Sequence, residues 1–388
     1  MKRVENILFF LTLLFLPTQL GRHFWPQFSF VYSLPIDYLA PTLYFWDILV
    51  IILVVVWLLN RRRINRLALN LLFIFMLAQM VSLIGQDVMA VGRGLVRLEQ
   101  YLIAGLLGVY IASVDFNKIK PFFIWALGAS LAAESILAMA QFIKGGTIGL
   151  WILGERSFTL STPGIAKFDF YGLEFLRPYG TFPHPNVLAA FCVIVVLLVP
   201  RIVTFVPAAA AIFLTVSRTA ILAGTVSAMW RLKKKIKIIF LILLVALLPI
   251  LYTRFSSAFN FDILSFVRRE EQAEIAIKMW SQSPLFGEGL NNFIPAASDQ
   301  LLSGPSRFLQ PVHNIFLLVL SETGLIGLIG LISLIGYPIW KRRLLSIWLV
   351  IIFLGMFDHY FLTLPQGYRL LFLVWGISLS KLVNGGFF

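Results

Sequence analysis

Residues 41–63 read PTLYFWDILVIILVVVWLLNRRR, an almost unbroken apolar run that ends in three arginines. A helix needs about 20 mostly apolar residues to cross the hydrocarbon layer of a bilayer. Lysine and arginine concentrate in the cytoplasmic segments that flank such helices. The stretch therefore predicts a membrane-spanning helix whose C-terminal end lies inside the cell.

The same pattern recurs along the whole chain, which has 388 residues, 59% of them hydrophobic and only 13% charged. Soluble domains have about 45–50% apolar and about 25% charged residues. From a cytoplasmic N-terminus, the apolar runs can be threaded alternately across the membrane at about 6–20, 41–59, 67–85, 95–113, 121–143, 184–200, 202–216, 218–230, 238–252, 312–336, 344–361 and 368–382. We therefore expect an all-α, polytopic protein of the cytoplasmic (inner) membrane, with one transmembrane domain over residues 1–388, about 12 spans and both termini cytoplasmic. The runs 202–216 and 218–230 are short enough to form one re-entrant hairpin instead.

The net charge of +14 could indicate nucleic-acid binding, because a basic stripe is the usual mark of phosphate contacts. The basic runs at 61–63, 233–235 and 341–343 instead adjoin apolar runs on the predicted cytoplasmic side. They are therefore interpreted as signals that orient the chain in the membrane. We expect membrane lipid as a partner and no binding of nucleic acid. The single cysteine, Cys192, lies in an apolar run, which excludes a disulfide framework and a cysteine-based metal site.

Three predicted external segments, 21–40, 144–183 and 253–311, are longer than a connection requires. Functional residues are common in such loops. The third segment contains a predicted amphipathic helix at about 266–282, followed by the helix-breaking sequence SPLFG at 283–287. The large external loops are therefore expected to carry short amphipathic helices and the site.

Polar residues gather in four stretches at this face: RPYGTFPHPN at 177–186, SRTA at 217–220, the segment from RR at 268–269 to GEGLNNF at 287–293, and HN at 313–314 continuing to ETGLIG at 322–327. Arg218 stands between two apolar runs with almost no loop around it, so its guanidinium must lie at the membrane surface. A guanidinium matches phosphate with two parallel hydrogen bonds, although an arginine here could also merely extend to the interface. Arg269 lies in a mixed cluster of charges, which by itself is typical of a solvated helix face.

His313 lies at the external edge of the tenth predicted span. Histidine titrates near neutral pH and can remove a proton from a hydroxyl, although a lone histidine is more often structural. His184 lies between two prolines that impose an extended entry into the sixth span, and Asn186 is a candidate cap for that helix. The four histidines are scattered along the sequence, and no metal-binding, Walker or dinucleotide motif is present. We therefore expect no metal and no cofactor.

Taken in order and spacing, the four stretches resemble the O-antigen ligase and polymerase family of bacterial membrane glycosyltransferases, over roughly residues 175–330. The Asp358-His359-Tyr360 stretch near the end of the chain also resembles this family. A departure is Ala273, where the family often has tryptophan four residues after the loop arginine, which leaves the choice between Arg268 and Arg269 open.

The resemblance implies metal-independent, inverting transfer of a glycan from a polyprenyl-pyrophosphate donor to an acceptor hydroxyl at the outer face of the inner membrane. The acceptor would be a glycan or a lipid: lipid A-core, a growing polysaccharide or another surface glycan. In this interpretation His313 is the catalytic base, and Arg218 and Arg269 bind the pyrophosphate. The supporting residues would be Arg177, His184, Asn186, Asn314 and Glu322.

Two alternatives stay open. Asp37 in the first external segment is a rival base, because other membrane glycosyltransferases with lipid-linked donors commonly use an early external carboxylate. A transporter or flippase of a lipid-linked or small-molecule substrate is the other, because intramembrane charges such as Asp47, Glu134 and Glu322 also mark transport paths. Within the family, the sequence does not choose between ligase, polymerase and protein O-glycosylation.

Overall fold

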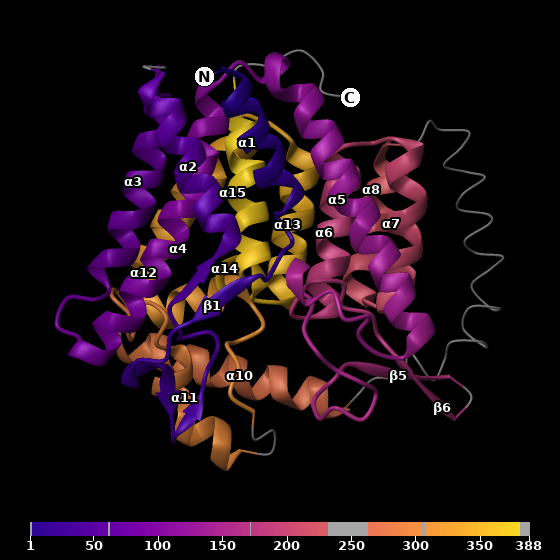
Figure 1. Ribbon diagram of the computed structural model, residues 1–388. Coiled ribbons are helices and arrows are strands. Elements are labelled where there is room, and N and C mark those ends of the chain that lie inside the picture. The colour runs from indigo at the N-terminus through magenta and orange to yellow at the C-terminus, as the bar shows by residue number, and fades with distance from the viewer. Residues whose placement is uncertain (1, 61–62, 171, 232–262, 305–307, 381–388) are drawn as a thin grey trace. The chain divides into compact units, whose positions relative to one another are not determined.

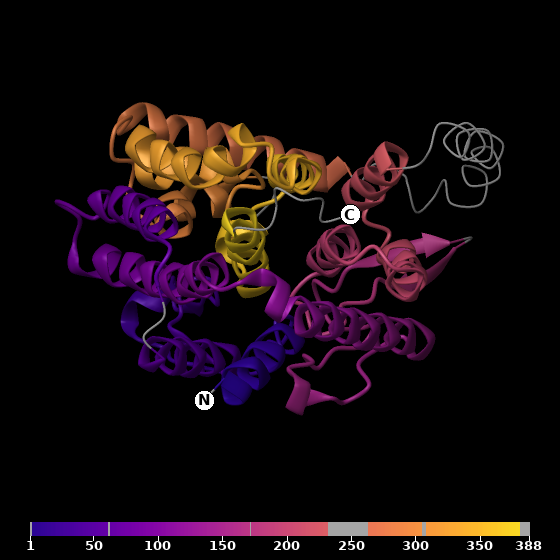
Figure 2. The ribbon, with the colours of Figure 1, turned by 90° about the horizontal axis from the view of Figure 1, so that it is seen from above.

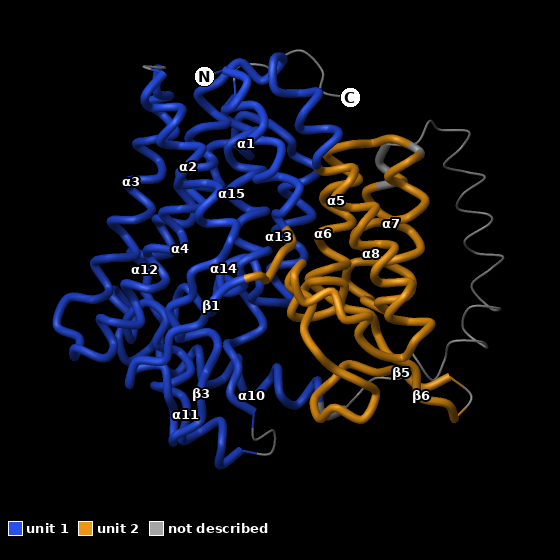
Figure 3. The backbone as a smooth tube through the Cα atoms, in the orientation of Figure 1, with its two compact units in different colours: residues 1–16, 21–126, 263–388 blue, residues 17–20, 127–262 orange. Residues whose placement is uncertain are grey.

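The computed structural model describes residues 2–60, 63–170, 172–231, 263–304 and 308–380. The chain forms two compact units (Figure 3). Unit 1 comprises Met1–Leu16, Gly21–Ala126 and Ile263–Phe388, and unit 2 comprises Pro17–Leu20 and Leu127–Asp262.

Unit 1 is a helical bundle. Its helices are α1 (Lys2–Leu14), α2 (Phe45–Leu59), α3 (Arg66–Val81), α4 (Val88–Ser113), the first part of α5 (Phe116–Lys144), α10 (Ile263–Gln282), α11 (Phe293–Ser303), α12 (Ile315–Trp340), α13 (Leu345–Phe357), α14 (Tyr360–Thr363) and α15 (Pro365–Leu379). The long helices α3, α4, α12 and α15 pack side by side (Figures 1 and 2). Helices α4 and α15 approach so closely that a Cβ atom at Gly376 would lie only 2.6 Å from the Gly108 carbonyl oxygen. Small residues at helix contacts serve this purpose in membrane bundles.

The first predicted external segment folds into two small antiparallel ladders. Strand β1 (Gly21–His23) pairs with β4 (Thr42–Tyr44), and β2 (Phe30–Val31) pairs with β3 (Leu34–Pro35), after the short 3-10 helix η1 (Gln27–Ser29). Strand β1 lies at the same end of unit 1 as α10 and α11 (Figure 1). Segments predicted to be external therefore gather at one end of this bundle.

Unit 2 contains the rest of α5, α6 (Pro185–Leu198), α7 (Ile202–Thr215) and α8 (Arg218–Arg231), with α6 packed against both α7 and α8. A 3-10 helix, η2 (Trp151–Leu153), and an antiparallel hairpin of β5 (Lys167–Phe170) and β6 (Leu173–Leu176) lie between α5 and α6 in sequence. Because α7 and α8 are separate helices joined at Val216, whose φ is 48°, the chain turns sharply just before Arg218.

Each predicted span with described residues overlaps a helix, and the run at 238–252 lies outside the described residues. The predicted amphipathic helix at 266–282 is confirmed as α10. Among the described residues, α4, α5 and α12 are long and apolar enough to cross a membrane. The second predicted span, at about 41–59, corresponds to α2 but begins later than expected, because residues 42–44 form strand β4 and α2 begins at Phe45. The count of about 12 spans and their orientation stay predictions.

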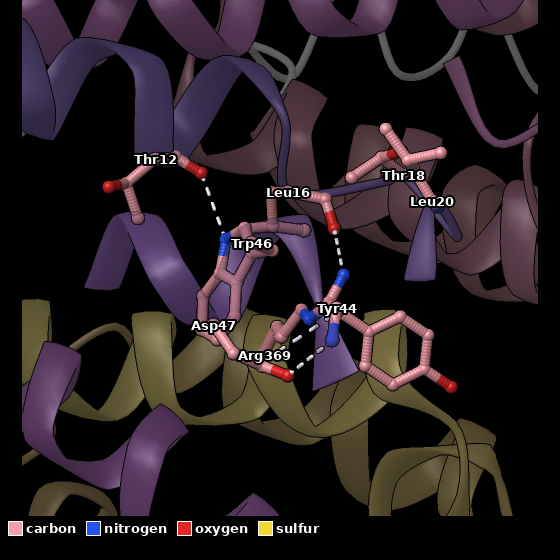
Figure 4. A network of polar contacts seen from close by, with 8 residues as sticks. All are labelled: Thr12, Leu16, Thr18, Leu20, Tyr44, Trp46, Asp47 and Arg369. Carbon is pink, nitrogen blue, oxygen red and sulfur yellow. Dashed lines mark hydrogen bonds and ion pairs between the residues drawn. The ribbon is translucent and has the colours of Figure 1, made fainter. Parts of the chain in front are cut away.

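A polar cluster inside unit 1 explains why α2 begins where it does (Figure 4). Asp47 accepts a hydrogen bond from the Tyr44 backbone N–H (3.0 Å), and its Oδ1 lies 3.9 Å from Nη2 of the fully buried Arg369. The Arg369 guanidinium also donates to the Leu16 carbonyl oxygen (3.2 Å) and lies over the rings of Tyr44 and Trp46, at 4.8 and 4.5 Å from their centroids. One buried ion pair thus links α15 to the first turn of α2 and to the chain just after α1.

Candidate functional site

His313 is held at the entrance to α12 by the residue that follows it. The Asn314 side chain caps the helix by accepting hydrogen bonds from the backbone N–H groups of Phe316 (2.9 Å) and Leu317 (3.1 Å). Its amide nitrogen donates to the Met356 carbonyl oxygen at the end of α13 (3.2 Å). Such capping satisfies N–H groups that have no partner inside the helix. Asn314 therefore positions His313.

The imidazole of His313 has a defined partner on α10. Its Nδ1 lies 2.7 Å from Oε1 of Gln272, while the Gln272 amide nitrogen donates to the Gln310 carbonyl oxygen (3.4 Å). An amide oxygen only accepts hydrogen bonds, so Nδ1 of His313 must carry the hydrogen. In the neutral ring Nε2 is then unprotonated, and Nε2 is the atom that could accept a proton from a substrate hydroxyl.

The charges around His313 favour this neutral form. Burial lowers the pKa of His313, Asp358 acts in the opposite direction, and Arg269 and then Arg268 lower the pKa further. The ring is therefore neutral at pH 7, as a general base must be. Arg269 acts on His313 more strongly than Arg268, whose guanidinium lies over the Phe308 ring at 4.8 Å from its centroid.

A second histidine lies beside the first. The rings of His313 and His359 have centroids 5.1 Å apart and are tilted by 69°, and His359 is buried. His313 and His359 are far apart in the sequence but adjacent in the structure, because the turn after α13 brings residues 358 and 359 to His313. For these two histidines the expectation of scattered positions is therefore wrong. The Asp358-His359-Tyr360 stretch was the only sequence signal for this neighbour.

His313, Asp358 and His359 could also hold a metal ion, since one ligand atom from each lies within 4.8 Å of the others. Nitrogen ligands around one tetrahedral zinc ion lie about 3.3 Å apart, as follows from Zn–N distances of about 2.0 Å. A separation as wide as 4.8 Å would therefore have to shrink on metal binding. A reaction without metal stays a prediction.

The buried Arg97 connects this histidine pair to the loop before α11, and sequence reasoning missed this residue. Nδ1 of His359 lies 2.6 Å from Oγ1 of Thr363, whose carbonyl oxygen accepts a hydrogen bond from Nη1 of Arg97 (2.8 Å). Nη2 of Arg97 donates to the Asn291 side chain (3.0 Å) and to the Tyr38 carbonyl oxygen (3.2 Å). A charged residue at the start of a predicted span was the available signal.

Glu322 supports the site through the backbone. Its carboxylate accepts hydrogen bonds from the N–H groups of Asn291 (3.0 Å) and Phe293 (3.1 Å). Two glycines allow this approach: a Cβ atom at Gly287 would lie 2.4 Å from the Glu322 carbonyl carbon, and one at Gly324 would lie 2.3 Å from that of Leu285. The stretches at 284–293 and 322–327 are thus two halves of one packed structure.

Unit 2 holds a second polar cluster, built on the stretch at 177–186. Arg177 donates from Nη2 to the Asn186 side chain (2.8 Å) and from Nε to the Thr215 carbonyl oxygen (2.6 Å). His184 is the N-cap of α6, and its Nδ1 accepts a hydrogen bond from the Asn186 N–H (3.2 Å). The expectation that Asn186 caps the helix is therefore wrong: His184 is the cap, and Asn186 lies inside the helix and accepts a hydrogen bond from Arg177.

Arg218 opens α8 near this cluster. Burial lowers the pKa of Arg177 to about 10, Tyr179 opposes this effect, and the positive charge of Arg218 adds to it. Arg177 still carries its charge at pH 7, so two positive charges act on each other here. The Ser217 hydroxyl is buried and has no hydrogen-bond partner among the described residues. Two guanidinium groups and a hydroxyl of this kind suit an oxyanion.

The structure therefore groups the predicted residues in two sets: Arg269, His313, Asn314 and Glu322 belong to unit 1, and Arg177, His184, Asn186 and Arg218 belong to unit 2. Asp37, the rival base, is exposed and belongs to unit 1.

Residues 203–332 match a family model described as O-antigen ligase. The matched segment includes Arg218, Arg269, His313 and Glu322, whereas the 177–186 stretch precedes it. No curated protein matches the chain. The match supports the O-antigen ligase family, and three of the four polar stretches lie within the matched segment.

Proposed function

We propose, from the O-antigen ligase match and the neighbours of His313, that this protein transfers a glycan from a polyprenyl-pyrophosphate donor to an acceptor hydroxyl at the outer face of the cytoplasmic membrane. The acceptor is a glycan or a lipid. The reaction needs no metal and inverts the anomeric carbon.

The reaction breaks the bond between the anomeric carbon and the donor phosphate oxygen, and it forms a bond from that carbon to the acceptor oxygen. Polyprenyl pyrophosphate is already a good leaving group, so catalysis requires stabilisation of the charge on its phosphate oxygens. Arg269 and Arg218 carry this role in the proposal, because fixed guanidinium groups bind phosphate bidentately. Arg177 supports Arg218 by adding a second positive charge in unit 2.

The acceptor hydroxyl attacks only as its proton leaves. The proposal assigns this proton to Nε2 of His313, because Gln272 accepts the hydrogen on Nδ1 and leaves Nε2 unprotonated. This is the single observation that carries the proposal. Direct attack from the face opposite the leaving pyrophosphate gives inversion.

Transport is less well supported than transfer. The three carboxylates that suggested a transport path each have structural partners: Asp47 pairs with Arg369, Glu134 accepts hydrogen bonds from the N–H and hydroxyl of Thr181, and Glu322 accepts two backbone N–H groups. Carboxylates with such partners stabilise the folded structure. Their positions therefore need no translocated ion to explain them.

The deciding experiment compares His313→Ala with Asp37→Ala in a purified system that contains the lipid-linked donor, and measures donor binding separately from transfer. We expect His313→Ala to bind donor normally and to lose at least about 100-fold in transfer rate, as for removal of a general base. Asp37→Ala should keep the parent rate. Normal transfer by His313→Ala together with inactive, donor-binding Asp37→Ala would overturn the assignment of the base.

The phosphate role is tested by neighbouring arginines on one helix. Arg269→Ala should weaken donor binding strongly, and Arg268→Ala should have a milder effect, because Arg268 lies over Phe308. Equal effects of the two substitutions would mean that the segment contributes only general positive charge.

A further inference from the structure

A short loop after α5 in unit 2 exposes an unusual run of apolar side chains. Leu150, Trp151, Ile152 and Leu153 are consecutive, and their exposed fractions are 39%, 72%, 61% and 40%. Four adjacent exposed apolar residues are costly in water and usually mark a binding surface. The run coincides with helix η2, so its backbone is ordered.

Glu155 fixes the loop from one side. Its carboxylate accepts hydrogen bonds from the backbone N–H groups of Ile148 (2.8 Å), Gly149 (2.8 Å) and Leu150 (2.6 Å), and from the side-chain amide of Gln141 (2.9 Å). Although burial raises the pKa of Glu155, these hydrogen bonds together lower it below its usual value. The carboxylate therefore stays charged and holds the turn at neutral pH.

The other side of the loop is fixed as firmly. The Leu153 carbonyl oxygen accepts a hydrogen bond from the Thr18 hydroxyl (2.7 Å). Gly154 has a φ of 92°, and a Cβ atom at this position would lie 2.6 Å from the backbone nitrogen of Gln19. Only glycine allows this approach. The tip residues Trp151 and Ile152 thus project from a clamped base.

The position of the loop indicates what covers it. Helix α5 is long and apolar enough to cross a membrane and ends at Lys144, only a few residues before the run. Its apolar side chains stay exposed to the end, as Ile143 shows with 84% exposure. Exposed Lys144 and Arg156 flank the run on both sides. Tryptophan beside basic residues at the end of a spanning helix is typical of the bilayer interface.

We infer that residues 150–153 form an anchor that inserts into the phospholipid headgroup and acyl boundary of the leaflet at this end of α5. Trp151 and Ile152 enter the boundary, and Lys144 and Arg156 face the lipid phosphates. The anchor does not depend on glycan transfer, so it stands or falls separately from the proposed function.

The test uses the full-length chain in phospholipid nanodiscs, with Cys192→Ala as background and a nitroxide attached at Ile152→Cys, which leaves Trp151 in place. Collision rates are measured with oxygen, which is enriched in the bilayer, and with a water-soluble nickel chelate. Ser161→Cys, exposed in the same predicted loop, is the aqueous control, and Leu222→Cys, exposed on α8, is the apolar reference.

We expect the ratio of oxygen to nickel collisions at residue 152 to approach that at residue 222 and to exceed that at residue 161 several-fold. A ratio equal to that at residue 161 would show that the loop lies in water and would overturn the anchor. Low collision rates with both reagents would mean that protein, such as a second copy of the chain, covers the loop, and would overturn it too.

Discussion

Replacing Gln272 separates the proton-accepting role of His313 from mere packing. Gln272→Leu removes the acceptor of the Nδ1 hydrogen, which then loses its partner at a partly buried position. A buried donor without an acceptor costs about 1–3 kcal/mol. The ring can avoid this cost by turning or by carrying its hydrogen on Nε2 instead of Nδ1. A change of tautomer removes the base. We therefore expect kcat to fall about 10- to 100-fold, since about 1.4 kcal/mol corresponds to a factor of ten.

Gln272→Glu should behave differently, because a carboxylate accepts the same hydrogen and also attracts the protonated ring. A hydrogen bond to a charged group contributes about 1.5–3 kcal/mol and favours the protonated ring, which raises the pKa of His313. Since burial and the two arginines hold the parent pKa below its usual value, parent activity should be flat above pH 7 and fall on acidification. In Gln272→Glu the fall should shift to higher pH, with the rate recovering in alkaline buffer.

The assay is the pH profile of kcat with lipid-linked donor and a soluble acceptor. Gln282→Leu and Gln282→Glu are matched controls, since Gln282 is the exposed last residue of the same helix. Unchanged kcat and pH profile in Gln272→Leu would refute the tautomer argument. A fall in both Gln272 variants with no alkaline recovery in Gln272→Glu would indicate a packing role only.

Further outcomes test the remaining parts of the proposal. Arg218→Lys should lose most donor binding although it keeps its charge, because lysine lacks the planar fork; parent-level binding would mean that the side chain only extends to the interface. Gly324→Ala should destabilise the fold by more than about 3 kcal/mol, because its φ is 61° and a Cβ atom would overlap backbone, whereas Gly336→Ala on the same helix should be neutral by thermal unfolding. Single cysteines in 144–183 should react with impermeant reagent from outside and those in 231–237 should not, and the reverse would overturn the orientation. Chelator treatment should leave transfer unchanged, and loss of activity restored by a divalent metal would refute the metal-free reaction.

The helices at the predicted spans were predictable because each overlaps an apolar run between polar breaks. Their ends were less so: Thr42 and Tyr44 read as part of a span, yet they pair with Gly21 and His23 in a strand ladder. Pairing over this distance in the chain leaves no local pattern. The start of α2 is set by Asp47, whose carboxylate accepts the Tyr44 N–H, and an acidic residue in an apolar run reads equally well as a transport group.

The candidate site was predictable only where the residue type itself indicates a chemical role, as with His313 and Arg218. Gln272 has no such signature, because a glutamine in a charged amphipathic helix is usually interpreted as a solvent-exposed residue. Its role follows from contact with a residue that lies 41 positions later. His359 was missed for the same reason, since only the turn between α13 and α14 brings it to His313.

Glycine and histidine motifs that look independent in the sequence depend on one another in the folded chain. Gly287 and Gly324 each lie against the backbone of the other's stretch, and this contact lets Glu322 hold the Asn291 N–H. Asn291 in turn accepts a hydrogen bond from Arg97, which fixes the Thr363 carbonyl oxygen beside His359. Any residue larger than glycine at either position would separate the two stretches, and the disturbance would reach the histidine pair through four hydrogen-bonded groups. The two glycines would therefore contribute to the proposed proton-accepting site through the fold that they permit.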